Sequence, residues 1–147
     1  MSDWRQNLVD DDAGAHRILR ASKRLAILGI KPESRATQPA FYVPQFLQHA
    51  GYGIVPVPVY YLEATSILGL PVYRSLAAIP GDIDLVVVFR RPKDIPPHVP
   101  DILAKRPQAV WFQLGIRNDE AAERLARAGI DVVQDRCLMI EARRIGR

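Results

Sequence analysis

Short apolar runs alternate with amphipathic stretches from residue 24 to the end of the chain. Five of these runs have the length and apolar content of strands that are buried on both faces. The predicted strands are residues 25–29, 54–58, 83–89, 109–113 and 130–134. Apolar residues at helical spacing predict helices between and around them, several of which begin or end at a residue suited to a cap. The predicted helices are residues 12–22, 41–50, 75–79, 92–105, 119–128 and 138–145.

This alternation is typical of an α/β protein, because parallel strands need right-handed crossovers that place helices on the faces of the sheet. We therefore predict one doubly wound, parallel, five-stranded sheet with a Rossmann-like fold. Residues 24–147 are expected to form this domain, and residues 1–23 an N-terminal extension that is partly helical. A chain of 147 residues has the ordinary size of a single domain.

The net charge of +4 and the isoelectric point near 9.5 favour anionic ligands. The basic residues are mostly spread along the chain and form no nucleic-acid-reading motif, so we predict no nucleic-acid partner. The sequence has no apolar run of the roughly 18 residues that a membrane helix needs, and no signal-peptide pattern near its start. With the single cysteine Cys137 it can form no internal disulfide. We expect a cytoplasmic protein that does not bind membranes, and leave a protein partner open.

The residues that follow each predicted strand are the first candidates for a site. In an open parallel sheet, ligands bind beyond the carboxyl ends of the strands, where the strand order reverses. These segments and their neighbours carry many cations and few acids: Lys31, Arg35, Arg90, Arg91, Lys93, Arg117 and Arg136 against Asp135 and the nearby Glu33. Cations beside helix N-termini predict a phosphate-binding rim.

An ordinary NAD site is disfavoured by two features. The loop after the first strand reads Gly29-Ile30-Lys31-Pro32-Glu33-Ser34-Arg35 and lacks the G-x-G-x-x-G pattern that lets the backbone approach a pyrophosphate. No carboxylate in residues 56–62 could hold a ribose hydroxyl at the end of the second strand.

Five segments stand out together: Ala26-Ile27-Leu28-Gly29 with Pro32, Gly51-Tyr52-Gly53-Ile54-Val55-Pro56-Val57, Asp84-Leu85-Val86 with Val88-Phe89-Arg90, Val110-Trp111-Phe112-Gln113-Leu114-Gly115, and Asp135-Arg136-Cys137. In this order and spacing they resemble the small CoA-binding protein family, whose members are similar to the CoA-binding domain of the succinyl-CoA synthetase α-subunit. The resemblance covers residues 24–145, nearly the whole chain.

The resemblance implies a Rossmann-like fold that holds coenzyme A across the strand ends. By position, residues 29–32 would meet the phosphates or the pantetheine arm, Val57 would line the adenosine side, and Phe89 and Arg90 would flank the nucleotide. Lys93 and Arg35 would be further phosphate partners. The candidate cofactor-binding residues are Gly29, Ile30, Lys31, Pro32, Arg35, Val57, Phe89, Arg90, Lys93, Gln113 and Gly115.

One departure from the family concerns the adenosine side. Family members usually read Pro-Val-Asn-Pro after the second strand, whereas this chain reads Pro56-Val57-Pro58-Val59. The missing asparagine removes an amide that could contact the ligand. Tyr60 and Tyr61, in the loop that follows, could flank an adenine.

Non-catalytic binding of coenzyme A or acyl-CoA is the interpretation that these observations favour. We assign no catalytic residue and no metal ligand, because His16 and His49 fall in predicted helices, His98 lies among prolines, and no pair has metal-ligand spacing. One alternative is an enzyme or enzyme component acting on CoA thioesters, with Cys137 or a partner chain supplying the chemistry. The other is a regulatory domain that senses NAD or another adenylate.

Overall fold

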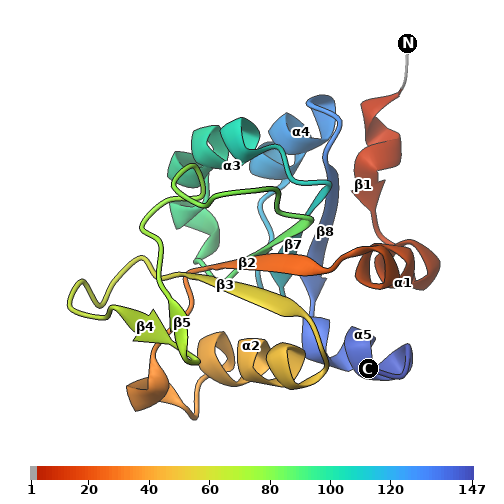
Figure 1. Cartoon of the computed structure of the whole chain (residues 1–147). Coiled ribbons are helices and arrows are strands. Elements are labelled where there is room, and N and C mark those ends of the chain that lie inside the picture. The colour runs from red at the N-terminus through yellow and green to blue at the C-terminus, as the bar shows by residue number, and fades with distance from the viewer. Residues whose placement is uncertain (1–2) are drawn as a thin grey trace.

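The computed structural model describes residues 3–147 and contains one main sheet of six parallel strands in the order β1-β8-β7-β6-β2-β3 (Figure 1). The strands are β1 (Leu8–Val9), β2 (Arg24–Leu28), β3 (Gly53–Val57), β6 (Leu85–Val88), β7 (Ala109–Gln113) and β8 (Asp131–Arg136). The predicted α/β, doubly wound, Rossmann-like fold is confirmed. The predicted number of five strands is one too low, because β1 has only two residues in a polar segment and shows no apolar run.

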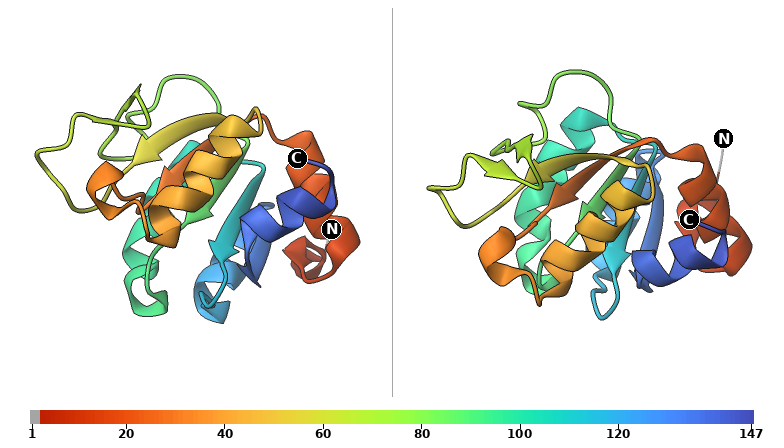
Figure 2. Two further views of the ribbon diagram at one scale, coloured as in Figure 1. Left: turned by 90° about the horizontal axis from the view of Figure 1, so that it is seen from below. Right: turned by 60° about the horizontal axis from the view of Figure 1, so that its bottom comes forward.

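Helices cover both faces of the sheet. The α-helices are α1 (Asp12–Ala21), α2 (Pro39–His49), α3 (Val99–Lys105), α4 (Asp119–Arg127) and α5 (Leu138–Arg144). Short 3-10 helices are η1 (Trp4–Asn7), η2 (Glu33–Arg35), η3 (Pro92–Asp94) and η4 (Pro96–His98). Figure 2 shows α2 and α5 side by side on one face with α1 next to α5, whereas α3 and α4 lie on the opposite face.

The core has two halves because successive strand residues point to opposite faces. Leu25 and Ile27 of β2 pack in the half covered by α1, α2 and α5. Ala26 and Leu28 of the same strand pack in the half covered by α3 and α4. A central strand buried on both faces has no polar position, which explains its continuous apolar run.

Two predicted elements differ from the structure. Residues 75–79, expected as a helix, form a turn in which the carboxylate of Asp101 accepts hydrogen bonds from the N–H groups of Leu76 and Ala77. Residues 92–105, expected as one helix, begin with η3 and η4 before α3 starts. Prolines at 92, 96, 97 and 100 explain the interruption, since each lacks a backbone donor.

The connection between β3 and β6 contains a small hairpin that the sequence pattern does not predict. Its strands are β4 (Ser66–Ile67) and β5 (Leu70–Pro71), which pair antiparallel. The N–H of Tyr73 donates to the carbonyl of Pro56 over 2.9 Å and ties this connection to β3. Pro56 is tolerated within β3 because that strand lies at the edge of the sheet.

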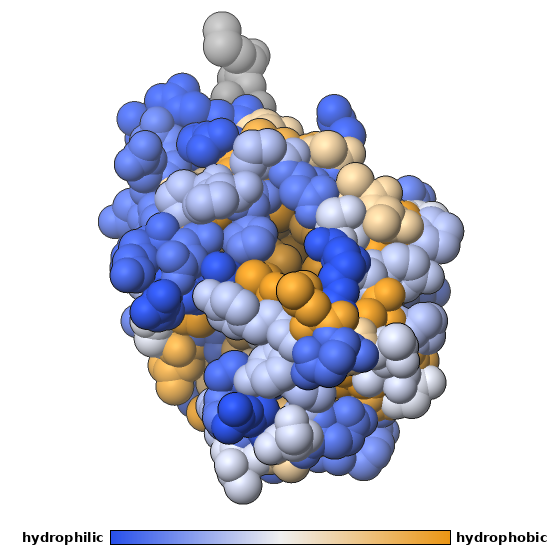
Figure 3. All heavy atoms as spheres, turned by 90° about the vertical axis from the view of Figure 1, so that its left-hand side faces the viewer, coloured by the Kyte–Doolittle hydropathy of each residue, from blue (hydrophilic) through white to orange (hydrophobic). Residues whose placement is uncertain are grey.

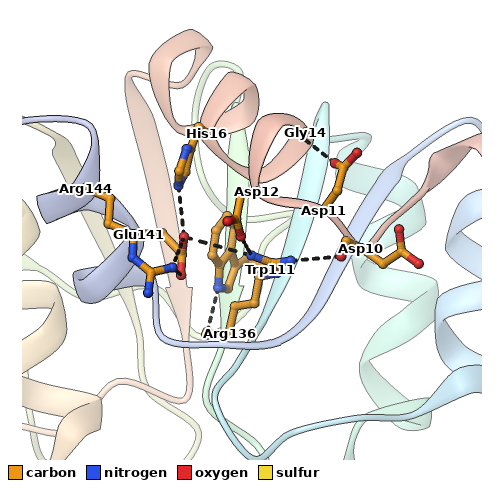
Figure 4. A network of polar contacts seen from close by, with 9 residues as sticks. All are labelled: Asp10, Asp11, Asp12, Gly14, His16, Trp111, Arg136, Glu141 and Arg144. Carbon is orange, nitrogen blue, oxygen red and sulfur yellow. Dashed lines mark hydrogen bonds and ion pairs between the residues drawn. The ribbon is translucent and has the colours of Figure 1, made fainter.

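Arg136 attaches the N-terminal segment to the end of β8 (Figure 4). Its guanidinium donates from Nη1 to the Asp12 carboxylate over 2.6 Å and from Nη2 to the Asp10 carbonyl over 2.8 Å. Beside it, the buried carboxylate of Glu141 lies 2.9 Å from Nε2 of His16 and 3.0 Å from Nη1 of Arg144. These contacts hold α1 and β1 against α5 and β8.

No helix within residues 3–147 combines the length and the apolar character needed to span a bilayer.

Candidate functional site

The strand order reverses between β2 and β6. The chain leaves β2 toward α2 on one face of the sheet and leaves β6 toward α3 on the other, so the two connections diverge. A crevice at the carboxyl ends of these two strands is where an open α/β sheet binds its ligand.

The backbone at this point is packed closely. The N–H of Gly29 donates to the carbonyl of Val57 over 2.9 Å, and the N–H of Phe89 donates to the carbonyl of Leu28 over 2.8 Å. Gly29 has a φ of +89°, and a side chain there would collide with the backbone of Phe89. Glycine is therefore required for the sharp turn and the close approach at the bottom of the crevice.

A pocket of about 230 Å³ opens between the loops that follow β2, β3 and β6, and we call it the β2–β6 pocket. It is lined by Gly29, Ile30, Lys31, Val59, Tyr60, Tyr61, Phe89, Arg90 and Arg91. Figure 3 looks onto the side of the molecule that carries the β3–β6 connection, where apolar atoms lie in a hollow bordered by hydrophilic residues.

A second pocket of about 350 Å³, the β6–β7 pocket, continues from the first. It is lined by Lys31, Gln38, Pro39, Ala40, Phe89, Arg90, Arg91, Pro92, Gln113, Leu114, Gly115 and Ile116. Lys31, Phe89, Arg90 and Arg91 belong to both pockets. The two pockets therefore form one elongated site with three cations in its middle.

Arg90 is held in place by two side chains. Its Nε donates to Nε2 of His98 over 3.2 Å, and its guanidinium lies 5.3 Å from the centre of the Tyr60 ring. Hydrogen bonding of the Tyr60 hydroxyl to the Arg90 guanidinium, followed by the positive charge of Arg90, lowers the pKa of that hydroxyl. Burial, followed by the charge of Arg90, lowers the pKa of His98. Neutral His98 is the form that accepts this hydrogen bond.

Among the described acids near the site, Asp94 alone pairs with a cation of the pockets. Glu33 accepts a hydrogen bond from the N–H of Leu68, and Asp101 binds the turn at residues 76–77. Asp94 pairs with Arg91 over 3.0 Å at an exposed position. Lys31 donates to the side-chain oxygen of Gln38, beside the N-terminus of α2. The end of this 11-residue helix adds a partial positive charge at the junction of the two pockets.

Arg74 shapes the outer wall of the β2–β6 pocket from a distance. Its guanidinium donates to the carbonyls of Tyr60, Tyr61, Leu62 and Ala64. Four hydrogen bonds from one planar group fix the loop that presents the two tyrosines. The hydroxyl of Tyr61 accepts a further hydrogen bond from Nε of Arg35 over 3.2 Å.

Seven of the eleven predicted site residues line one of the two pockets, namely Gly29, Ile30, Lys31, Phe89, Arg90, Gln113 and Gly115. Arg35 reaches the site only through Tyr61. Pro32 precedes η2, and Lys93 is exposed in η3; neither lines a pocket. The side chain of Val57 is 1 % exposed and packs in the core, because residue 57 faces the α3 and α4 layer.

Sequence reasoning left several lining residues out of the selected set. Arg91 is one of the cations predicted at the strand ends but does not belong to the predicted set, and Tyr60 and Tyr61 are predicted only as possible neighbours of an adenine. The signal that could have found all three is their position directly after a strand. The contact between His98 and Arg90 has no such signal, since it depends on how η4 folds back toward β6.

Cys137 and the metal-ligating residue types form no part of either pocket. Cys137 is half-buried, directly precedes α5 and lines neither the β2–β6 nor the β6–β7 pocket. Among residues 3–147 no group of three His, Cys, Asp or Glu side chains is placed to hold a metal ion.

Comparison with known proteins gives consistent matches. The family model of the CoA binding domain matches residues 23–143. The uncharacterized protein YneT of Bacillus subtilis (strain 168) is 36% identical over 123 residues, which are 84% of this chain and 87% of YneT. A Thermus thermophilus structure, cell-free ID.343, is 37% identical with a TM-score of 0.84 and covers 92% of this chain and 98% of its own. A hypothetical protein from Pyrococcus horikoshii OT3 is 31% identical with a TM-score of 0.81 and covers 91% of each chain.

Proposed function

The chain belongs to the family of CoA binding domains, and we propose that it binds coenzyme A non-catalytically along the β2–β6 and β6–β7 pockets. The observation that carries this proposal is the position of the cations. Lys31, Arg90 and Arg91 line both pockets at the point where the strand order reverses, within the segment that the family model matches.

The phosphates of coenzyme A would lie at these cations. Arginine can form paired hydrogen bonds with phosphate oxygens, and lysine supplies a point charge. Arg90 is only partly engaged, since its Nε donates to His98 and its guanidinium lies 5.3 Å from the centre of the Tyr60 ring. The N-terminus of α2 lies beside Lys31 and favours the same anion.

The adenosine end would lie against Val59, Tyr60 and Tyr61. The Tyr60 side chain is 59% exposed, so one face of its ring is free to stack on a base. Pro58 has no side-chain amide at the position where family members usually have asparagine. We therefore propose that stacking on tyrosine replaces an amide hydrogen bond to the adenosine.

The non-catalytic part of the proposal rests on the residues around the pockets. His98 is occupied by Arg90, and Cys137 lies outside both pockets. The lining includes no histidine, cysteine or carboxylate, the side chains that most often act as general base or nucleophile on a thioester. Binding of the ligand, as free coenzyme A or as an acyl thioester, is the function that this lining supports.

Calorimetric titration of the purified protein with coenzyme A, dephospho-CoA and NAD tests the proposal. We expect micromolar or tighter binding of coenzyme A, and affinity about tenfold lower without the 3′-phosphate, because a hydrogen-bonded charge pair is lost. Acetyl-CoA incubated with the protein should keep its thioester. Binding of NAD without binding of coenzyme A would contradict the proposal, and release of the acyl group would contradict its non-catalytic part.

A further inference from the structure

The β6–β7 pocket has a different character from the β2–β6 pocket. Beyond the shared cations its lining is largely apolar and includes Ala40, Pro92, Leu114 and Ile116. The Leu114 side chain is 60% exposed in this structure. A large apolar side chain left in water at the mouth of a pocket is stabilised when an apolar ligand group covers it.

Gln113 supplies the polar group in this pocket. The residue is only 4% exposed, and its Oε1 accepts a hydrogen bond from the N–H of Leu138 over 3.1 Å. That bond fixes the orientation of the amide and leaves Nε2 as the free donor. Nε2 forms no hydrogen bond with any residue in the range 3–147. Every fully buried side-chain nitrogen or oxygen described there has a partner, so Nε2 is not fully buried. Nε2 is therefore open to the pocket that Gln113 lines.

A donor without a protein partner that opens into a largely apolar pocket is suited to a carbonyl oxygen attached to a hydrocarbon group. A thioester carbonyl with a short alkyl chain has this chemistry. Resting on the proposed function, we propose that the β6–β7 pocket is an acyl site. There the Nε2 of Gln113 donates to the thioester carbonyl of a short-chain acyl-CoA, and Leu114 covers the alkyl chain.

The position of this pocket agrees with such a ligand. It continues from the β2–β6 pocket through Lys31, Phe89, Arg90 and Arg91, so the acyl group would lie beyond the cations that hold the phosphates. Its volume of about 350 Å³ is in the range of small-molecule sites. Acyl-CoA, rather than free coenzyme A, is then the preferred ligand.

The test compares the affinities of coenzyme A, butyryl-CoA and its thioether analogue S-butyl-CoA by calorimetric titration. We expect butyryl-CoA to bind about eightyfold more tightly than coenzyme A, since its two methylenes contribute roughly fourfold each and the hydrogen bond to its carbonyl about fivefold. The thioether lacks the carbonyl and should bind about fivefold more weakly than the thioester, the effect of one neutral hydrogen bond.

Two variants assign these effects to residues. Leu114→Ser should reduce the preference for butyryl-CoA over coenzyme A about threefold. Leu62 is 80% exposed and lies outside both pockets, so Leu62→Ser should leave this preference unchanged. Gln113→Glu keeps an oxygen for the Leu138 N–H but removes the donor, so the thioester should lose its advantage over the thioether. Circular dichroism checks that each variant is folded.

The outcomes separate this inference from the proposed function. Absence of coenzyme A binding would overturn the proposed function and the acyl site with it. Tight binding of coenzyme A with equal affinity for butyryl-CoA, unchanged in Leu114→Ser, would overturn the acyl site alone. An equal loss of preference in Leu62→Ser would also overturn it, because the preference would then come from the surface in general.

Discussion

The carbonyl oxygen of Phe89 lies 2.3 Å from the position that a Cβ would take on Gly29. The chains leaving β2 and β6 thus touch backbone to backbone at the point where the strand order reverses. No residue other than glycine fits at position 29 without moving one of the two loops that form the β2–β6 pocket.

Replacing Gly29 by alanine should therefore lower stability and displace the site. Gly129→Ala is a matched control, since Gly129 has a φ of +85° and no atom within 4 Å of an added Cβ. The control should lose about 1 kcal/mol from backbone strain alone. Gly29→Ala should lose roughly 2 kcal/mol more from the collision, as measured by urea denaturation. Equal losses in the two variants would show that the loops separate without strain.

The burial of His98 beside the positive charge of Arg90 predicts a pH dependence of stability. The pKa of His98 is lowered in the folded protein, so below the ordinary value of 6.5 the unfolded state binds more protons than the folded state. This contribution to stability is complete above pH 6.5 and is lost as the pH falls toward the lowered pKa. Melting temperatures measured between pH 7.5 and pH 5 should fall more for the natural protein than for His98→Gln. Parallel curves would remove His98 as the cause.

Substitution of Glu141 is expected to lower the stability of the fold without lowering the affinity for coenzyme A. Its carboxylate is buried and is shared by His16 and Arg144, with Arg136 at 3.9 Å (Figure 4). Glu141→Gln keeps the shape but removes the charge, which should lower the free energy of unfolding by about 2 kcal/mol. Glu123→Gln breaks only an exposed pair with Arg127 and should change it by less than about 0.5 kcal/mol. Reduced coenzyme A affinity in Glu141→Gln would show that the network reaches the site.

Substitution of Cys137 is expected to leave the affinity for coenzyme A unchanged. Because its side chain lines neither pocket, Cys137→Ser should bind coenzyme A within about twofold of the natural protein, less than the effect of one hydrogen bond. Mass spectrometry of the natural protein after mild oxidation with coenzyme A should find no mixed disulfide. A mixed disulfide formed at a stoichiometric level would instead support thiol chemistry at this residue.

The sequence was sufficient for the architecture because the central strands are buried on both faces. Leu85–Val88 has no polar residue and could be assigned without any tertiary information. The short edge strand β1 was missed because Leu8 and Val9 pair only with Val132 and Val133 and carry no pattern of their own. The sequence predicts a helix at residues 75–79 where the structure has a turn, because the residue that stabilises the turn, Asp101, lies far along the chain.

The same distinction applies to the site. Gly29, Lys31 and Arg90 could be selected because they follow strands, and the carboxyl ends of parallel strands meet at one edge. Alternate residues of β3 point to opposite faces of the sheet, and this alternation directs Val57 into the core. The face that each residue takes was not predictable from an apolar run that contains two prolines, because a shift of one residue reverses it. The support of the tyrosine loop by Arg74 depends on four carbonyl contacts that leave no trace in the sequence.

The central claim is that coenzyme A binds where β2 and β6 end, with Arg90 on a phosphate. Calorimetric titration of coenzyme A into the natural protein, Arg90→Ala and Arg127→Ala tests it most directly. Arg127 lies on α4 over the Trp4 ring and away from both pockets, so its variant has the same change of net charge. The account predicts micromolar or tighter binding that weakens about tenfold or more in Arg90→Ala and stays unchanged in Arg127→Ala. No binding to the natural protein, or equal weakening in the two variants, would contradict it.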